Sequence, residues 1–361
     1  MPDGSPHRCA GAILALCCVY VGWTAVSPCG HPLARRPSAQ GEVEPVLMPT
    51  PPVSPSRNLV MSMAYGYPYH RFEVFVRSLR GTGYSGDILL FTNFTAEPER
   101  DRRRGGRADD PRIPVLLSEH NVTFVDVGTT KTAAPSWVHA KLARYLLYAK
   151  FAAKSAYAEG LVLVLDFRDV VFQADPFANV RLRGEWLRFY EELFPPTIRQ
   201  SRWTFEWIQE CWGDAAAERV ANAVIVCSGA TMGTAAGIVH YATTMATAIQ
   251  SAPRPQCIDH DQRYHNYLLY TGRFKQVRLL RAGHAEVYNL GYIGRHNRSV
   301  HGLNPERWRH IDDITVRQND GSSVVLNEDG APAAVLHQYD RVDFLARDVR
   351  AQYVTQSPRE H

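Results

Sequence analysis

The sequence has little of what marks zinc-binding, disulfide-rich or nucleic-acid-binding proteins. Only seven of its 361 residues are cysteines, and their spacing matches no zinc-ligand pattern. Four of them lie in or just after an apolar N-terminal segment, which leaves Cys211, Cys227 and Cys257 and permits at most one disulfide among these three. The formal net charge is only +4, and no zinc-finger or RNA-binding motif accompanies it, so we expect no nucleic-acid partner. With 45% hydrophobic residues, the chain is long enough for one large α/β domain or two small ones.

The apolar N-terminal segment runs without a charge from Cys9 to Val26. Its length lies between that of a short membrane helix and that of a signal-peptide core. We expect a signal anchor over residues 9–27 behind a short cytoplasmic tail, residues 1–8, with the rest of the chain in the lumen of the secretory pathway. The alternative is a signal peptide cleaved after Ala25 or Ser27, which releases a secreted protein.

A proline-rich segment follows, within residues 28–57, and it lacks periodically spaced apolar residues. This composition favours an extended stem between the membrane and a folded domain. Three Asn-x-Ser/Thr triplets agree with a luminal domain. They begin at Asn93, Asn121 and Asn297.

The first part of that domain has the pattern of a β-α-β unit. Asn58–Met63 and Ile88–Thr92 predict two buried strands, and Val122–Val125 predicts a third. Between the first two, apolar residues recur at helical spacing at Phe72, Phe75, Val76 and Leu79. These elements predict a parallel sheet with a right-handed crossover.

A run of five aliphatic residues, Leu161–Leu165, predicts a strand buried on both faces. Asp166 and Asp169 follow it at the carboxyl end, which is the edge of an open α/β sheet where ligands bind. Their oxygens would suit Mg²⁺ or Mn²⁺ together with a diphosphate. The alternative is a turn in which the aspartates pair with Arg168.

A long helix is expected from Ser136, just before this strand. Lys141 and Arg144 lie one helical turn apart, on a face shared with Tyr148. They would either reach a diphosphate or form an exposed polar face. The apolar face would comprise Val138, Leu142, Tyr145, Leu146 and Ala149.

Later segments predict further elements. Apolar residues between Leu187 and Phe194 recur at helical spacing. Asn222–Ser228 predicts a strand that opens at Gly229 into a glycine-rich turn and a helix, without the spacing of a dinucleotide-binding loop. Val324–Leu326 and Ala333–His337 predict the two strands of a hairpin.

Two polar motifs stand out in the second half of the chain. Asp261 and Gln262 begin a predicted helix, which either Asp259 or Asp261 would cap in the alternative interpretation. His337 ends the predicted hairpin, with Arg341 shortly after it. Imidazole can complete a carboxylate metal site, although a single histidine after a strand is often structural.

Taken in order, these motifs resemble those of the GT-A type nucleotide-sugar glycosyltransferases. The buried strand with Asp-x-x-Asp and Asp175-Pro176-Phe177 resembles the family's metal-binding segment. The family usually has Asp-x-Asp, whereas Arg168 takes the third position here. The Asp261-Gln262 pair resembles the Asp-Gln segment of glycogenin-like members, and His337 resembles the late histidine of many retaining members.

The resemblance implies one catalytic domain at residues 58–347 and a C-terminal tail at 348–361. Its fold would be α/β, with a mixed, mainly parallel sheet flanked by helices. It also implies roles for individual side chains. The metal ligands for Mn²⁺ or Mg²⁺ would be Asp166, Asp169 and His337. The donor, a nucleotide-diphosphate sugar, would contact Lys141, Arg144, Asp261, Gln262 and Arg341.

The resemblance further implies a glycan, glycoprotein or glycolipid acceptor and an enzyme of the Golgi or endoplasmic reticulum. Trp203, Trp207 and Trp212 would either line the acceptor site by stacking on sugar rings or belong to the core. The sequence does not assign a general base. The candidates are Glu206, Glu210 and Asp259.

Two other functions use the same residues. A catalytically silent GT-A-like luminal protein would bind glycans or a partner enzyme. A metal-dependent hydrolase would use the carboxylates to activate water, although the sequence shows no second acid cluster for a two-metal site.

Overall fold

A computed structural model of the chain describes most of the expected domain. The described residues are 57–93, 110–127, 137–193, 195–254, 257, 260–281, 283, 286–293 and 311–355, with the backbone alone at 137–142. The expected tail, anchor and stem, together with Asp259, Asn297 and the Lys141 side chain, lie outside them. None of the described helices is both long enough and apolar enough to cross a membrane.

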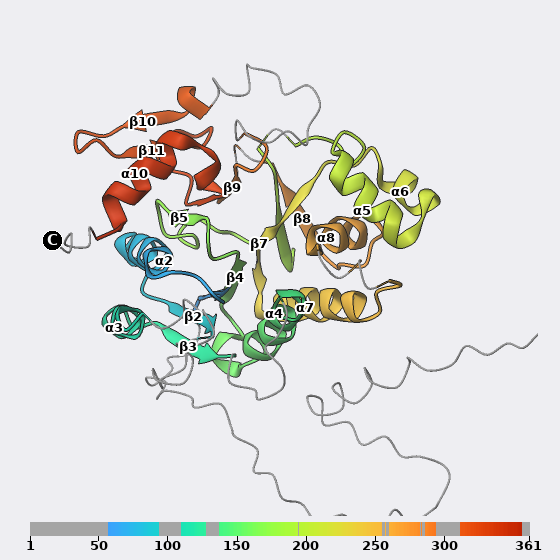
Figure 1. Ribbon diagram of the computed structural model, residues 1–361, viewed down its shortest axis with the longest axis horizontal. Helices are drawn as coiled ribbons and strands as arrows, with labels where there is room; N and C mark the ends of the chain where they lie inside the picture. Colours follow the sequence, from blue (N-terminus) through green and yellow to red (C-terminus); the bar gives the residue numbers. More distant parts are fainter. Residues whose placement is uncertain are drawn as a thin grey trace, which may run out of the picture. The chain divides into compact units, whose positions relative to one another are not determined.

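A seven-stranded sheet lies at the centre of the domain, in the order β3-β2-β1-β4-β7-β6-β8 (Figure 1). β7 runs antiparallel to both of its neighbours, and the other pairs are parallel. The predicted mixed, mainly parallel sheet is therefore confirmed. The strands are β1 (Leu59–Met63), β2 (Asp87–Thr92), β3 (Thr123–Asp126), β4 (Leu161–Leu165), β6 (Leu187–Glu191), β7 (Val226–Thr234) and β8 (Val277–Leu280).

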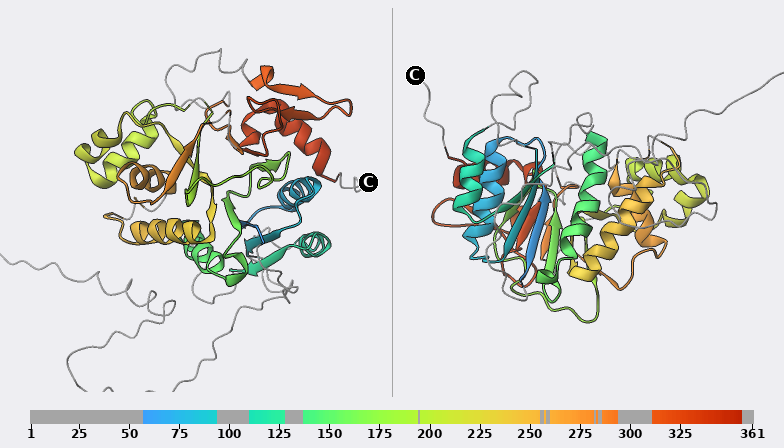
Figure 2. Two further views of the ribbon diagram at one scale, coloured as in Figure 1. Left: turned by 180° about the vertical axis from the view of Figure 1, so that it is seen from behind. Right: turned by 90° about the horizontal axis from the view of Figure 1, so that it is seen from below.

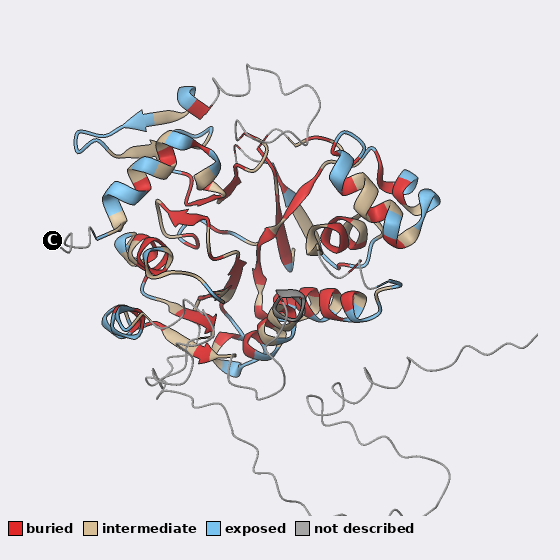
Figure 3. Ribbon diagram, viewed as in Figure 1, coloured by how far each residue is buried: buried red, intermediate tan, exposed pale blue. Residues whose placement is uncertain are grey.

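Helices cover both faces of this sheet (Figure 2). Residues of β1 alternate between them: Val60 packs in one core with α2 and α3, whereas Leu59 and Met61 pack in another with α4, α7 and α8. Figure 3 shows the central strands buried, and α3 and α7 with exposed residues on part of their surface. The helices are α2 (Tyr69–Gly81), α3 (Arg112–Glu119), α4 (Trp137–Ala152), α7 (Ala235–Gln250) and α8 (Asp261–Tyr270).

A second, three-stranded sheet brings the C-terminal part of the chain to the end of β4. Its order is β5-β12-β9, formed by Val170–Phe172, Val335–His337 and Val287–Asn289. β5 follows β4 after four residues, and the pairing of β5 with β12 places His337 opposite Val170. The register therefore brings the late histidine next to Asp169.

Three short elements complete this C-terminal region. β10 (Thr315–Arg317) and β11 (Ser323–Val325) form an antiparallel pair. A 3₁₀ turn, η4 (Tyr339–Arg341), then leads into α10 (Asp343–Tyr353). α10 packs beside α2 and buries Leu345 and Val349, which fixes the segment that follows His337.

The helix predicted near Leu187 is wrong, because Leu187–Glu191 is strand β6. Leu187, Arg188, Phe189 and Tyr190 are all buried, so both faces of the strand are covered. A strand buried on both sides shows no alternation of apolar and polar residues. Its apolar positions can then mimic the spacing of a helix.

The predicted strand at Asn222–Ser228 begins and ends too early. Strand β7 runs from Val226 to Thr234, so Gly229 lies inside a strand rather than at the opening of a loop. The predicted hairpin is also wrong in its pairing. β11 pairs with β10 and β12 with β5 and β9, while only an isolated bridge, Leu326 to Pro332, joins the two predicted strands.

The predicted apolar face of α4 is wrong at Leu146, and Tyr148 belongs to the buried face instead. Tyr148 is buried in the core, whereas Leu146 is exposed at the surface. Beyond the sheet, α5 (Arg202–Trp212) and α6 (Asp214–Val220) form a helical layer next to α8. A disulfide joins Cys211 to Cys257, and Cys227 is a buried free thiol.

Candidate functional site

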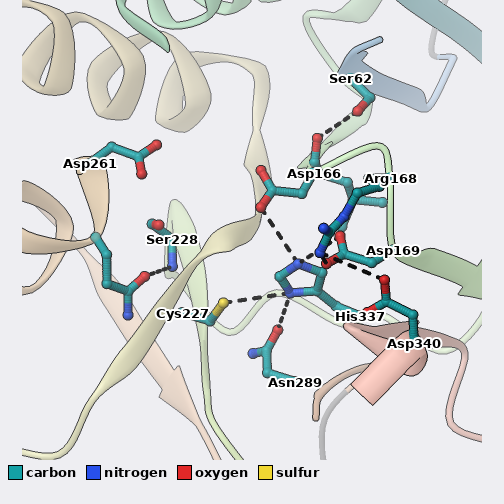
Figure 4. A network of polar contacts seen from close by, with 12 residues as sticks. Ser62, Asp166, Arg168, Asp169, Cys227, Ser228, Asp261, Asn289, His337 and Asp340 are labelled. Carbon is teal, nitrogen blue, oxygen red and sulfur yellow. Dashed lines mark hydrogen bonds and ion pairs between the residues drawn. The ribbon is translucent and has the colours of Figure 1, made fainter. Parts of the chain in front are cut away.

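Asp166, Asp169 and His337 meet where β4 and β12 end (Figure 4). His337 Nε2 lies 3.6 Å from Asp166 Oδ2 and 3.7 Å from Asp169 Oδ1. One potential ligand atom from each residue falls within 4.8 Å of the other two. The three predicted metal ligands therefore form a group whose oxygen and nitrogen atoms suit a divalent cation.

The orientation of His337 supports a cation at this point. Asn289 Nδ2 donates to the carbonyls of Tyr190 and Glu191, so its Oδ1 accepts from His337 Nδ1, at 2.9 Å. The neutral imidazole then presents the Nε2 lone pair to two carboxylates. His337 Nε2 is buried and has no hydrogen-bond partner among the described residues. Only a proton or a metal ion would make this arrangement favourable.

When no metal is bound, a proton on His337 Nε2 stabilises the close approach of the imidazole to the two aspartates. Burial lowers the pKa of His337, but Asp166 and Asp169 outweigh burial and raise that pKa above its usual value. For Asp166, enclosure raises the pKa, whereas Arg144 and then His337 lower it by more. Arg144 and His337 thus favour the ionised form of the Asp166 carboxylate, which is the form that binds a metal.

The loop after β4 is tied to the segment after β12. Gln338 N donates to the Asp169 carbonyl at 2.6 Å, and Gln338 adopts a left-handed conformation, with φ of 60°. A non-glycine residue in this conformation costs roughly 1 kcal/mol or more, and such residues gather at functional sites. This backbone contact fixes the distance between Asp169 and His337.

Arg168, the residue that departs from the family motif, pairs with Asp169. Its guanidinium donates to Asp169 Oδ2 at 2.6 Å and lies 3.7 Å from Asp340. The pairing that the alternative interpretation expected is therefore present. It involves Oδ2, however, while Asp169 Oδ1 is the oxygen that faces His337.

Arg144 bridges two of the predicted site residues. It donates to Asp166 Oδ1 at 2.7 Å and to Asp261 Oδ2, and Tyr145 OH also donates to Asp261, at 2.8 Å. Burial lowers the pKa of Arg144, but the surrounding tyrosines and Asp166 raise it well above its usual value. The structure thus places Arg144 between two carboxylates, where it positions both.

Asp261 and Gln262 lie at the start of α8, on the opposite side of Arg144 from the metal-ligand group. Gln262 is held by β7, since its Nε2 donates to the Val226 carbonyl and its Oε1 accepts from Ser228 N. His260 is the N-cap residue and makes no side-chain capping bond, so capping does not explain Asp261. Both residues line the same cavity as Asp166 and His337.

This cavity has a volume of about 520 Å³ and opens over the carboxyl end of the sheet. Of the residues singled out from the sequence, Trp203, Trp207 and Arg341 also line it, whereas Trp212 packs against Tyr264 and Tyr267. Lining residues to which the sequence analysis gave no site role include Glu192, Ser201, Thr204, Cys227, His260, Tyr292, Asp340 and Asp343.

Glu192 is the most informative of the missed residues. Its side chain is buried, burial raises its pKa, and Oε2 has no hydrogen-bond partner among the described residues. Two of the residues proposed from the sequence as the general base, Glu206 and Glu210, do not line the cavity. Glu206 pairs with Arg202, and Glu210 is exposed. Glu192 follows the largely apolar segment Leu187–Tyr190, and acids at the end of a buried strand would have marked it as a site candidate. That segment was predicted to be a helix, so this signal was not used.

Gly229 explains how β7 can pass directly behind the metal-ligand group. A Cβ atom there would lie 2.7 Å from Asp166 Oδ2 and 2.8 Å from His337 Nε2. The predicted turn at Gly229 is therefore absent, and Gly229 leaves space for the side chains of Asp166 and His337 from within strand β7.

Comparisons with known proteins find similarity in structure only. No family model and no curated protein matches the sequence. Among solved structures, the galactosyltransferase LgtC, in complex with donor and acceptor sugar analogues, is 15% identical with a TM-score of 0.42 and covers 84% of this chain and 98% of its own. The bifunctional glycosyltransferase WbbM is 13% identical with a TM-score of 0.40, and GlyE of Streptococcus pneumoniae TIGR4 is 13% identical with 0.36. The WbbM match covers 64% of this chain and 40% of WbbM, and the GlyE match covers 63% and 45%.

Proposed function

We propose that the chain is a glycosyltransferase of the GT-A type, which moves a hexose or related sugar from a nucleotide-diphosphate donor to an acceptor. The observation that carries this proposal is the Nε2 atom of His337, which is buried, has no hydrogen-bond partner among the described residues and lies near two carboxylates. These three residues would hold Mn²⁺ or Mg²⁺, which neutralises the negative charge of the donor diphosphate when bound.

The neighbouring residues would bind the two ends of the donor. Arg341 lines the cavity with a half-exposed side chain and would add positive charge near the phosphates. Asp261, which Arg144 and Tyr145 hold in place, would accept hydrogen bonds from hydroxyls of the donor sugar. Lys141 remains proposed as a second phosphate contact, one helical turn before Arg144. Gln262 would help by holding β7 against α8.

Glu192 is the carboxylate best placed to act on the reacting sugar. It lies on the cavity floor beside Cys227 and close to the metal-ligand group. An ionised carboxylate there would stabilise positive charge on the sugar as the bond to the leaving diphosphate breaks. The acceptor class, a glycan, glycoprotein or glycolipid, and a location in the Golgi or endoplasmic reticulum membrane or in the secreted fraction are part of the same proposal.

The test is binding of UDP and GDP to the full chain by calorimetry, with Mn²⁺ and then with EDTA. We expect one nucleotide to bind only with metal, and Asp169→Asn to abolish that binding. Asp313→Asn makes the same chemical change at an exposed position that does not line the cavity and should have no effect. Absence of binding for both nucleotides in the presence of Mn²⁺ would overturn the proposal.

The catalytically silent protein is the second candidate, favoured by one observation. Arg168 occupies Asp169 Oδ2 and Arg144 occupies Asp166 Oδ1, so each carboxylate has one oxygen engaged in an ion pair. In that case glycan binding would persist in Asp169→Asn and no nucleotide would bind. The hydrolase is less favoured, because the described residues contain one such group of metal-ligating side chains, and two-metal hydrolysis needs a second.

A further inference from the structure

Three aromatic side chains form one wall of the cavity, and we call them the aromatic shelf: Trp203, Trp207 and His260. His260 stacks on Trp207 with ring centroids 4.1 Å apart and an angle of 13° between the rings, and Trp203 lies 6.1 Å from Trp207. Trp203 is 54% exposed although it lines a cavity. We propose that this shelf is the acceptor subsite and takes an uncharged pyranoside. This inference rests on the proposed function.

The shelf is held rigidly in place. α5 buries Thr204, Ile208 and Cys211, which leaves Trp203 and Trp207 on the side toward the cavity. The disulfide from Cys211 to Cys257 ties the end of α5 to the segment before α8. Arg263, itself buried, donates to the Trp207 carbonyl at 3.3 Å and to Cys211 Sγ at 2.8 Å. A surface held in this way loses little conformational entropy when a ligand stacks on it.

Hydroxyl groups lie next to the shelf. Ser201 Oγ is 3.1 Å from Thr204 Oγ1 and 3.2 Å from Tyr292 OH, and all three residues line the cavity. Hydroxyls can both donate and accept hydrogen bonds, so this cluster matches the hydroxyls of a sugar. An aromatic face beside a hydroxyl cluster suits a pyranose, which has an apolar C–H face and a polar rim.

The charge of the cavity favours an uncharged ligand. Five carboxylates are found among its described lining residues, with Arg341 as the guanidinium that faces them. A bound cation would neutralise part of that charge near Asp166, and Arg168 and Arg341 lie within 4 Å of Asp340. Glu192 and Asp343 also line the cavity and form no ion pair with another described residue. A carboxylated or sulfated sugar would therefore meet repulsion on the shelf.

The position of the shelf separates it from the β1-α2-β2 unit, which would be the nucleotide-binding half by the resemblance to GT-A glycosyltransferases. α5 and α8 lie on the β7-β6 side of the sheet, whereas the β1-α2-β2 unit lies across β4 on the other side (Figure 1). The metal-ligand group lies between them, at the end of β4. A donor with its nucleotide over β1 and its diphosphate at Asp166 would leave the shelf to the second substrate.

The test uses saturation-transfer NMR on the full chain with Mg²⁺, which is diamagnetic, and with UDP or GDP, using methyl glycosides of glucose, galactose, mannose and xylose as probes. We expect at least one methyl pyranoside to receive saturation through its ring C–H protons. Trp203→Ala should weaken that binding about tenfold, the loss expected for one stacking contact. Trp186→Ala removes another exposed tryptophan outside the cavity and should leave it unchanged.

The other outcomes distinguish this inference from the proposed function. If the nucleotide binds but no pyranoside does, or Trp203→Ala has no effect, the shelf assignment is wrong and the transferase proposal stands. Loss of nucleotide binding in Trp203→Ala would assign the shelf to the base and overturn the acceptor subsite. If no nucleotide binds to the wild-type chain, the transferase proposal fails and the acceptor role fails with it. Methyl glucuronide binding as tightly as methyl glucoside would contradict the charge argument.

Discussion

Asn289 fixes which nitrogen of His337 faces the two aspartates. Its amide donates to two backbone carbonyls of the strand that precedes Glu192, so its oxygen is the group left to accept from His337 Nδ1. β9 and β12 place the two residues opposite each other in a parallel pair. The proposed metal ligand and the residue that orients it thus come from adjacent strands of the smaller sheet.

Replacing Asn289 with leucine should weaken metal binding without removing a ligand. Loss of an orienting partner typically lowers metal affinity by about 10- to 100-fold. We expect that loss for Mn²⁺ in calorimetry, with metal-dependent nucleotide binding weakened in parallel. Asn266→Leu is the matched control, because Asn266 is equally buried and also holds backbone groups of its neighbours, but does not contact His337. Equal Mn²⁺ affinities in the two variants would contradict the orienting role.

Gly229→Ala should occupy the space in which the ligand atoms lie. The new methyl group would come within 3 Å of Asp166 Oδ2 and His337 Nε2, so one of these side chains would have to move. We expect Mn²⁺ affinity to fall by more than about tenfold. Gly81→Ala is the control, because no atom lies within 4 Å of its added Cβ and its backbone conformation is ordinary. Unchanged Mn²⁺ binding in Gly229→Ala would show that the metal, if any, binds elsewhere.

The sequence predicted the strands that have local signals and missed the contacts that depend on pairing. β1, β2 and β4 were predicted within a residue, and the buried face of the first helix was predicted correctly, because their apolar patterns are strong and short-range. Asp166, Asp169 and His337 were grouped through the family resemblance. Their separation of about 170 residues leaves no local pattern that would bring them together.

Other features could not be predicted for physical reasons. Strand β6 is covered on both faces, so its sequence lacks the alternation of apolar and polar residues that would distinguish a strand from a helix. Glu192 follows that strand, and its role went unnoticed with it. The ion pairs of Arg144 depend on where α8 docks, which no pattern within α4 reveals.

The pair formed by Arg144 and Asp261 should be energetically coupled. Arg144→Met alone leaves two carboxylates without their partner, and we expect a loss of roughly 3 kcal/mol or more in unfolding free energy. Asp261→Asn removes one of those charges, so the double variant should be more stable than the sum of the single effects, by about 1–3 kcal/mol. Urea denaturation of the wild-type chain, the two single variants and the double variant measures this coupling energy. Additivity within about 0.5 kcal/mol would show that the two side chains do not interact in solution.

His265 should make the stability of the domain depend on pH. It is fully buried beside Phe189 and Tyr241, and burial, followed by Arg144, lowers its pKa from 6.5 to about 3. The unfolded chain therefore binds a proton below pH 6.5 that the folded chain does not bind. The stability contribution of the neutral imidazole is complete above pH 6.5 and falls as the pH drops toward 3.

Replacing His265 with phenylalanine removes the group whose protonation makes stability depend on pH. Between pH 7 and pH 4.5, the wild-type chain should lose about 3 kcal/mol more unfolding free energy than His265→Phe. The replacement also removes the hydrogen bond to Tyr241, which lowers stability by about 1 kcal/mol at every pH and leaves the slope unaffected. His70→Phe makes the same change at an exposed histidine and should alter the slope far less. Parallel stability curves for wild type and His265→Phe, measured by urea denaturation at five pH values, would show that His265 is protonated equally in the folded and unfolded chain.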